Sequence, residues 1–274
     1  MVSILALLTC FNRKEKTEQS IRSIVRDNPD CRISFVITDD NSTDGTIQML
    51  EEMKAVFDIH ILKGNGSLFY SGGMCLAMQY AKEKMKQSYD YMLMMNDDVE
   101  FFNHSIEKMI AQSIVQNNAI IAGAMKNDDG SLSYGAVKYI QGIKYRTLSI
   151  NEWEVDADTF NANCVLIPWK VFQATEIIDN YYIHSLGDFD YGLSLKRNGY
   201  KIHTSKNFVG ICNNNPAKGT WIDTSLSRKQ RIKKKESLKG APIKQWFYFL
   251  NKNFGIIVAI KSCVTPYIRI LFRK

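Results

Sequence analysis

The chain has 274 residues, 45% of them hydrophobic, which is enough for one large domain or for one domain with an appendage. Its net charge of +7 is uneven: from Leu226 onward 13 Lys and Arg residues accompany one acid, a balance of +12, whereas the preceding residues carry −5. Six scattered cysteines without a Cys-x-x-Cys pair argue against a zinc ribbon or a disulfide framework and fit a reducing cytosol.

The first half of the chain alternates strand-like runs with segments of helical periodicity. Strands are predicted at Ile4–Leu8, Ile33–Thr38, Ile59–Leu62, Tyr91–Met95 and Ala119–Ala122. Helices are predicted at Thr17–Val25, Thr46–Val56, Gly73–Met85 and Ser105–Val115. This alternation predicts an α/β fold with a single open, mostly parallel sheet flanked by helices. Ile4–Leu8 is too short for a signal peptide. The sequence contains no run of about 18 uncharged apolar residues, so no membrane span is predicted.

The second half is less regular. The polar stretch 127–153 reads as an excursion beside the core, and 161–168 is a further candidate strand followed by a helix to Ile178. A short helix is expected within 187–199, and the residues from Leu226 onward look helical, with a break near Gly240-Ala241-Pro242.

Acidic clusters follow two of the predicted strands. Asp39 and Asp40 come after the second strand, and Asn96-Asp97-Asp98 comes after Tyr91–Met95. Carboxylates at the ends of buried parallel strands line the crevice where open α/β sheets bind ligands. The first pair fits recognition of the imide N–H of uracil or thymine, and the second cluster fits a divalent metal beside a diphosphate. Helix capping and a simple turn are the structural alternatives for the two clusters.

A third acidic pair, Asp188 and Asp190, opens the short helix that ends near Gly199. A carboxylate at a helix N-terminus can act as the general base for an acceptor hydroxyl. Capping of the helix, with an ion pair to Lys196 or Arg197, is the structural alternative.

Together these motifs resemble glycosyltransferase family 2. The resemblance rests on Thr9-Cys10-Phe11-Asn12-Arg13, on 38–46 (TDDNSTDGT), on Asn96-Asp97-Asp98 and on Gly187-Asp188-Phe189-Asp190, and it covers about residues 1–215. It implies an A-type, nucleotide-diphospho-sugar transferase fold and an enzyme that inverts the anomeric centre. It further implies nucleotide-sugar contacts from Thr9, Phe11, Arg13, Asp40 and Asp97, a Mn²⁺ or Mg²⁺ ion on Asp98, and catalysis by Asp188.

The chain departs from the family pattern at three places. Asn96 stands where the family often has the first Asp of Asp-x-Asp, and Gly187 stands where Glu usually precedes the base. Many relatives place a His, a candidate metal ligand, in the region that here reads Val209-Gly210-Ile211-Cys212-Asn213, while His203 lies earlier, on a predicted strand, and is read as structural. These departures keep open a degenerate family member that acts as a non-catalytic binding or scaffold subunit.

Gly73 is predicted to lie along the nucleotide-sugar, because Gly72-Gly73 precedes a helix whose N-terminus would face the diphosphate. A simple turn is the alternative. A sugar-nucleotidyltransferase, the rival enzyme class, would need a glycine-rich basic loop where this chain has 9–13 (TCFNR). The segment around Gly73 also resembles relatives that act on bacterial surface polysaccharides, some of which transfer rhamnose.

The predicted division is a catalytic domain at 1–225 and a basic, aromatic-rich segment at 226–274. Basic residues beside large apolar ones are typical of an amphipathic segment on an anionic membrane. Packing of the aromatic residues on the catalytic domain and a nucleic-acid tail are the alternatives. The expected protein is a cytoplasmic enzyme, peripheral on the inner face of the membrane, that moves a sugar from a UDP- or dTDP-sugar to a growing, lipid-linked surface glycan (capsule, O-antigen or cell-wall polysaccharide).

Overall fold

A computed structural model describes residues 1–272, and residues 273 and 274 of the predicted C-terminal segment lie outside the described part. The main sheet has eight strands in the order β3-β2-β1-β4-β10-β6-β11-β5. Its strands are β1 (Val2–Cys10), β2 (Cys31–Asp39), β3 (Asp58–Lys63), β4 (Tyr91–Met95), β5 (Glu100–Phe101), β6 (Ile120–Lys126), β10 (Cys164–Pro168) and β11 (Ile202–Ile211). A small second sheet contains β7 (Ala136–Gln141), β8 (Lys144–Thr147) and β9 (Thr159–Phe160).

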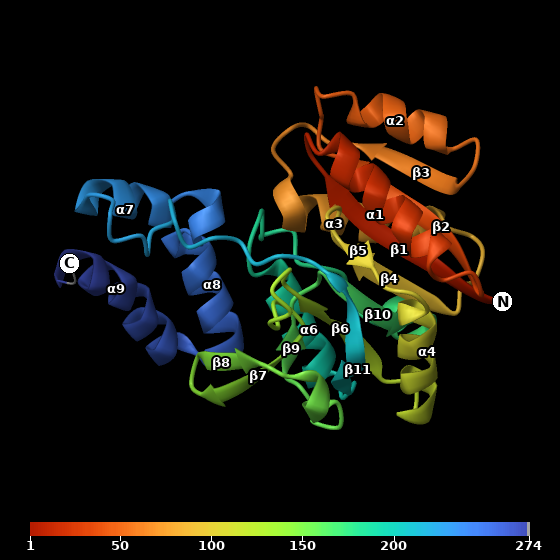
Figure 1. Ribbon diagram of the computed structural model, residues 1–274. Helices are drawn as coiled ribbons and strands as arrows, with labels where there is room; N and C mark the ends of the chain where they lie inside the picture. Colours follow the sequence, from red (N-terminus) through yellow and green to blue (C-terminus); the bar gives the residue numbers. More distant parts are fainter. Residues whose placement is uncertain (273–274) are drawn as a thin grey trace.

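Helices cover both faces of the main sheet (Figure 1). They are α1 (Lys14–Arg26), α2 (Thr46–Met53), α3 (Phe69–Lys84), α4 (Ser105–Val115), α5 (Trp169–Ala174) and α6 (Gly187–Arg197). Strand β1 shows why both faces need cover: Ile4, Ala6 and Leu8 belong to one buried cluster, whereas Leu5 and Leu7 belong to the other. Because successive side chains of a strand point to opposite faces, a continuous apolar run like this one requires a layer of helices on each side.

The predicted α/β fold with a mostly parallel sheet is confirmed. Strands β3, β2, β1 and β4 pair in parallel, and so do β6 and β11, whereas β10 runs antiparallel to both of its neighbours, β4 and β6. The expected helix at Gly73–Met85 begins earlier, at Phe69, and the helix expected to reach Ile178 ends at Ala174. The excursion at 127–153 forms the β7–β8 hairpin.

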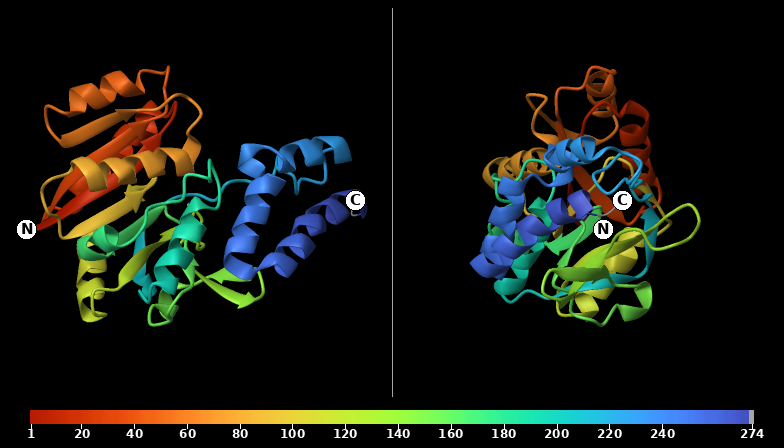
Figure 2. Two further views of the ribbon diagram at one scale, coloured as in Figure 1. Left: turned by 180° about the vertical axis from the view of Figure 1, so that it is seen from behind. Right: turned by 90° about the vertical axis from the view of Figure 1, so that its left-hand side faces the viewer.

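The C-terminal segment forms α7 (Arg228–Lys235), α8 (Ile243–Phe254) and α9 (Ile256–Phe272). These helices lie together at the end of the molecule opposite to α2 and β3 (Figures 1 and 2). Helix α8 packs on the rest of the chain, because its buried Phe249 and Leu250 share a cluster with Val137, Tyr182 and Phe189. Among the helices described, none combines the length and the apolar character that crossing a bilayer requires. Whether residue 225 separates two folding units stays a prediction.

Candidate active site

A cavity of about 580 Å³ opens at the carboxyl ends of β1, β2 and β4. It brings together six predicted site residues from strand ends and the loops that follow them: Thr9, Phe11, Arg13, Asp40, Asp97 and Asp98. Asp188, from the first turn of α6, lines the same cavity. Residues that are far apart in the sequence therefore meet at one edge of the sheet, as expected for ligand sites in open α/β sheets.

The loops after β1 and β2 are fastened to each other by short polar side chains. The Asn12 side-chain oxygen accepts a hydrogen bond from the backbone N–H of Thr43 (2.7 Å), and the Asn12 N–H donates to the Ser42 hydroxyl (2.9 Å). Asp44 accepts from the N–H groups of Lys14 and Thr46, both at 3.0 Å. These bonds fix the start of α1 against the start of α2. The loops after β1 and β2 therefore hold their cavity-lining residues in place.

Asp40 organises the loop that leads into α3. Its carboxylate accepts hydrogen bonds from the backbone N–H groups of Gly66 (2.8 Å), Leu68 (2.9 Å) and Phe69 (3.0 Å). Phe69 has a φ of 53°, a left-handed conformation that a bulky aromatic residue adopts only when its surroundings hold it there. Asp40 is 4% exposed and also lines the cavity, so it shapes this loop, while the predicted contact of Asp40 with a base stays a prediction.

Arg13 connects the two carboxylates that follow β4. Its guanidinium donates to Asp97 at 3.0 Å and to Asp98 at 2.8 Å. Burial raises the pKa of Asp97 to about 6, while the neighbouring Arg13 acts in the opposite direction. Asp97 and Asp98 thus bring negative charge to the cavity, and the guanidinium of Arg13 balances part of it.

A divalent metal is compatible with the groups around Asp98. The side-chain oxygen of Asn96 is buried and has no hydrogen-bond partner among the described residues, which is unusual for a buried polar atom. The Cys212 thiol donates to Asp98 Oδ1 at 3.6 Å, so Cys212 lies where many family members would place their His. Carboxylate and amide oxygens suit Mg²⁺ and Mn²⁺. Asp98, with Asn96 beside it, would hold such an ion.

Asp188 is fixed by backbone groups. Its carboxylate accepts from the N–H of Ala162 (3.2 Å) and from the N–H of Phe189 (2.9 Å). Burial raises the pKa of Asp188 to about 6, and the two N–H groups oppose that shift. A carboxylate with a pKa near 6 is ionised at neutral pH and accepts a proton more readily than an ordinary Asp, which suits a general base.

Two glycines explain further features of the site. A Cβ at Gly187 would lie 2.6 Å from the Ser71 hydroxyl, so the position before Asp188 has no room for the Glu that the family usually carries. A Cβ at Gly73 would lie 2.2 Å from Thr9 Oγ1, which shows that Gly73 lets α3 pack on the end of β1. Among the described residues Gly73 does not line the cavity, and its predicted contact with the nucleotide-sugar stays a prediction.

Several residues of the cavity wall were not predicted from the sequence. His184 precedes α6 and meets Phe69 edge to face at 5.8 Å, and its buried Nδ1 has no hydrogen-bond partner within residues 1–272. Burial lowers its pKa, and the positive charges of Lys239 and Arg13 act in the same direction. Only its nearness to Asp188 in the sequence could have singled it out. Trp246 and Lys239, from the C-terminal segment, also line the cavity, and no local pattern marks them.

Asp190, the second acid of the α6 motif, has a different role. It is 2% exposed and accepts from Lys252 Nζ (2.7 Å) and from the Asn253 side-chain amide (2.8 Å), both on α8. It therefore holds the C-terminal segment against α6. His203 lies on β11, 9% exposed, and is not among the described residues that line the cavity.

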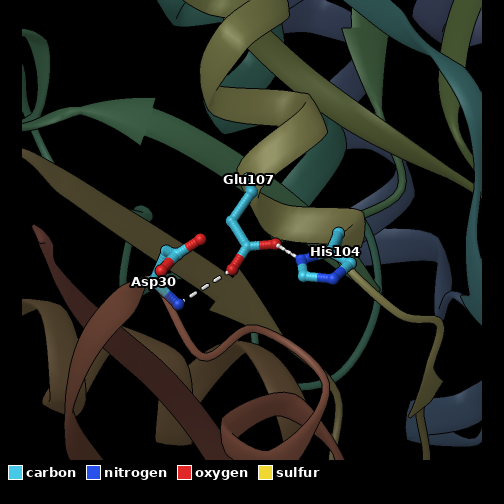
Figure 3. Close-up of side chains that lie close together, drawn as sticks. All are labelled: Asp30, His104 and Glu107. Atoms are coloured by element: carbon cyan, nitrogen blue, oxygen red, sulfur yellow. Dashed lines mark hydrogen bonds and ion pairs between the residues drawn. The ribbon is translucent and has the colours of Figure 1, made fainter.

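A separate group of candidate metal ligands contains Asp30, His104 and Glu107 (Figure 3). Glu107 accepts from the N–H of Asp30 at 3.0 Å and is hydrogen-bonded to His104 Nδ1. Asp30 precedes β2 while Asp40 follows it, so the nine residues of this strand separate the group from the cavity. Its hydrogen bonds join the start of β2 to the start of α4, and it takes no part in the site.

The chain resembles a known family in sequence and known proteins in structure. The sequence model of "Glycosyl transferase family 2" matches residues 6–167. No curated protein matches the chain at the level of sequence. Among solved structures, residues 1–349 of S. aureus TarS superpose with a TM-score of 0.60 at 13% identity, over 98% of this chain and 90% of that one. A mannosyltransferase from Pyrobaculum calidifontis, PcManGT in complex with GDP-Man and Mn²⁺, has a TM-score of 0.60 at 10% identity, over 96% of this chain and 74% of that one. TarS was also solved with UDP-GlcNAc, at a TM-score of 0.58, 12% identity and coverage of 97% and 82%. At these identities the structural likeness establishes the fold.

Proposed function

The chain belongs to glycosyltransferase family 2, and from this premise we propose that it moves a sugar, with inversion, from a UDP- or dTDP-sugar to a growing, lipid-linked bacterial surface glycan. The transferred sugar would be a hexose or a deoxyhexose such as rhamnose. The observation that carries the proposal is the meeting of Asp97, Asp98 and Asp188 in one cavity of about 580 Å³. This cavity is large enough for a nucleotide-sugar with an acceptor beside it.

Asp188 would perform the chemical step at the acceptor. Its ionised carboxylate takes the proton of an acceptor hydroxyl as the hydroxyl oxygen bonds to the anomeric carbon and the bond from that carbon to the diphosphate oxygen breaks. The bond pair leaves with the nucleoside diphosphate. The N–H groups of Ala162 and Phe189 keep the carboxylate in place for this transfer. Attack from the face opposite to the leaving group inverts the anomeric centre.

The donor would lie along Thr9, Phe11, Arg13, Asp40 and Asp97, all of which line the cavity. A divalent cation held at Asp98 would neutralise charge on the departing diphosphate. The hydrogen bonds of Arg13 to Asp97 and Asp98 keep its guanidinium close to the place where the diphosphate would lie. The structure of PcManGT with Mn²⁺ and that of TarS with UDP-GlcNAc support a nucleotide-sugar and a metal in this fold.

A panel of nucleotide-sugars tests the donor proposal. Thermal unfolding of the purified chain is followed with UDP-, dTDP- and GDP-sugars, each with and without Mn²⁺. At 100 times Kd a ligand adds about 2.7 kcal/mol to the free energy of unfolding, so a true donor gives a clear rise in Tm. Stabilisation by a UDP- or dTDP-sugar that depends on Mn²⁺ supports the proposal. Stabilisation by GDP-sugars alone would contradict the base preference, and no stabilisation by any member would contradict the whole proposal.

A non-catalytic binding subunit is the second candidate, and Asn96 and Gly187 are the observations that favour it. Such a protein would bind a nucleotide-sugar without cleaving it. Release of nucleoside diphosphate in the presence of Mn²⁺ and the stabilising donor separates the two candidates. The loop 9–13, which is held by the β2–α2 loop and carries no glycine, gives no support to a sugar-nucleotidyltransferase.

We propose further that the C-terminal segment lies on an anionic membrane at the cytoplasmic face. Helix α9 exposes apolar side chains at helical spacing, namely Ile257, Ile260, Val264, Ile268 and Leu271, each at least 45% exposed. Helix α7 next to it carries six basic residues in eight, from Arg228 to Lys235, of which all but the buried Arg231 and Lys235 are available to a surface. An apolar helix face beside a basic cluster is the composition of interfacial helices.

A further inference from the structure

Aromatic residues from two separate parts of the chain line the cavity. We propose that Trp246 of α8 and Tyr145 of the β7–β8 hairpin form an acceptor subsite that binds the ring faces of a pyranoside. This inference rests on the proposed function and names the acceptor side of the same site. It gives the C-terminal segment a role in transfer, whereas the sequence predicts a catalytic domain at 1–225.

Trp246 is held in a fixed orientation at the cavity wall. Its ring stacks on Phe249 with centroids 5.7 Å apart and planes inclined by 13°. Phe249 is 2% exposed and packs with Tyr182 and Phe189, so it anchors α8 to the rest of the chain. Trp246 itself remains half-buried and lines the cavity. The ring of Phe249 thus packs α8 on the rest of the chain, whereas the ring of Trp246 is available to a ligand.

Tyr145 lines the cavity from the hairpin. It is 54% exposed and meets Phe189 edge to face at 5.3 Å. Tyr139, from the other strand of the hairpin, lies 5.9 Å from Tyr145, centroid to centroid. Tyr145 and the proposed base Asp188 line the same cavity. The hairpin therefore supplies an aromatic surface close to the reacting hydroxyl.

An aromatic surface of this kind suits the binding of a sugar ring. A pyranose has C–H groups on its faces and hydroxyl groups around its edge. Aromatic faces cover the C–H groups and exclude water, while the hydroxyls stay free for polar partners. An acceptor ring held by Trp246 and Tyr145 can direct one edge hydroxyl toward Asp188, which gives the geometry that a general base requires.

The first turn of α6 positions both Trp246 and the proposed base Asp188. Asp190, two residues after Asp188, accepts from Lys252 (2.7 Å) and Asn253 (2.8 Å) of α8, and Lys252 also donates to Asp179 at 2.9 Å. Docking of α8 therefore places Trp246 relative to the first turn of α6. Lys252 and Asn253 act as positioning residues, and they belong to a segment beyond the family match at 6–167.

The test compares Trp246→Ala with Phe247→Ala. Phe247 is the next residue on α8, is 37% exposed and is not among the described residues that line the cavity, so it is a matched control. The acceptor probes are p-nitrophenyl α- and β-glycopyranosides of glucose, galactose, mannose, N-acetylglucosamine and rhamnose, used with the stabilising donor. Trp246→Ala should raise the acceptor KM about tenfold, with the donor KM unchanged. Phe247→Ala should change neither constant.

Three results would overturn the inference. One is an acceptor KM in Trp246→Ala within twofold of the wild type, and another is an equal rise in the donor KM. The third is a wild type that hydrolyses the donor but neither uses nor binds any glycoside by saturation-transfer NMR, which leaves the proposed function standing. If the wild type neither binds nor cleaves any nucleotide-sugar, the proposed function fails and the inference fails with it. Should Trp246→Ala not fold, Tyr145→Ala, on the exposed hairpin, provides the same comparison.

Discussion

The proposed donor half and the proposed acceptor half of the cavity are built in different ways. On the donor side, carboxylates stand directly after β2 and β4, and neighbouring loops hold them: three backbone N–H groups bind Asp40, and Arg13 joins Asp97 to Asp98. On the proposed acceptor side, aromatic rings from a hairpin and from the C-terminal helix α8 line the cavity together with Asp188. The first half depends on strand ends, and the second depends on contacts between distant segments.

This difference indicates how each half can vary. Parallel strands fix the positions of their carboxyl ends, so a nucleotide-sugar site survives at low sequence identity. An acceptor wall made from appended segments can change without disturbing that framework. Substitutions on the donor side should therefore affect donor binding, and those on the acceptor side should affect transfer alone.

The largest effect is expected from Asp188→Asn. Loss of a general base lowers the rate by about 10² to 10⁴, because Asn cannot take the proton of the acceptor hydroxyl. Donor affinity should remain near that of the wild type. Initial rates of transfer measure the first quantity and calorimetric titration the second. Turnover close to normal would remove Asp188 from the role of base.

Asp98→Ala should come next. The metal would lose its principal carboxylate, so Mn²⁺-dependent activity should fall by on the order of 100-fold or more, and donor binding should weaken with it. Activity is measured over a series of Mn²⁺ and Mg²⁺ concentrations, with Asp30→Ala, at the remote acidic group, as the matched control. Full activity of Asp98→Ala in either metal would place the metal elsewhere.

Asp40→Ala should weaken donor binding and leave the metal requirement unchanged. The three N–H groups of Gly66, Leu68 and Phe69 would lose their charged acceptor, so the free energy of unfolding should fall by on the order of 3 kcal/mol. Urea denaturation measures that loss, and the Mn²⁺ dependence of the remaining activity is compared with the wild type. An unchanged midpoint would show that these bonds contribute little.

The pH dependence should separate activity from stability. Asp188 must be ionised to act, and its pKa is about 6, so kcat/KM should fall about tenfold for each pH unit below 6. Stability should change in the opposite direction. The pKa of Asp188 is above its unfolded value near 4, so the folded state holds the extra proton between pH 4 and 6 and loses this stabilisation as pH rises through 6. A flat rate profile from pH 5 to 8 would contradict the assignment.

The smallest effect concerns the membrane. Flotation with anionic vesicles at low salt should carry the full chain upward, and rising salt should release it, because surface charges are screened within about 8 Å at physiological ionic strength. Ile257→Glu, at a side chain 80% exposed on α9, should abolish flotation. Ile140→Glu, 66% exposed on β7, is the control. A full chain that stays at the bottom of the gradient would contradict the membrane proposal.

The sequence predicts the donor half well for a physical reason. The run Ile33–Thr38 and the run Tyr91–Met95 are apolar enough to mark buried strands, and the acids that follow them must then meet at one sheet edge. That Trp246 lines the same cavity as Tyr145 could not be predicted, because it results from the docking of α8 on α6 through Asp190. Likewise, the clash that a side chain at Gly187 would have with Ser71 is visible only once α3 and α6 are packed.

The division between the two halves is tested most directly by donor affinity measured side by side in three proteins. Calorimetric titration of the stabilising nucleotide-sugar in Mn²⁺ is carried out on the wild type, Asp98→Ala and Asp188→Asn. Asp98→Ala should raise the donor Kd at least about tenfold, since the cation that joins protein and diphosphate is lost. Asp188→Asn should keep the wild-type Kd although it no longer transfers sugar. Equal weakening in both variants, or none in either, would contradict a cavity with separate donor and acceptor sides.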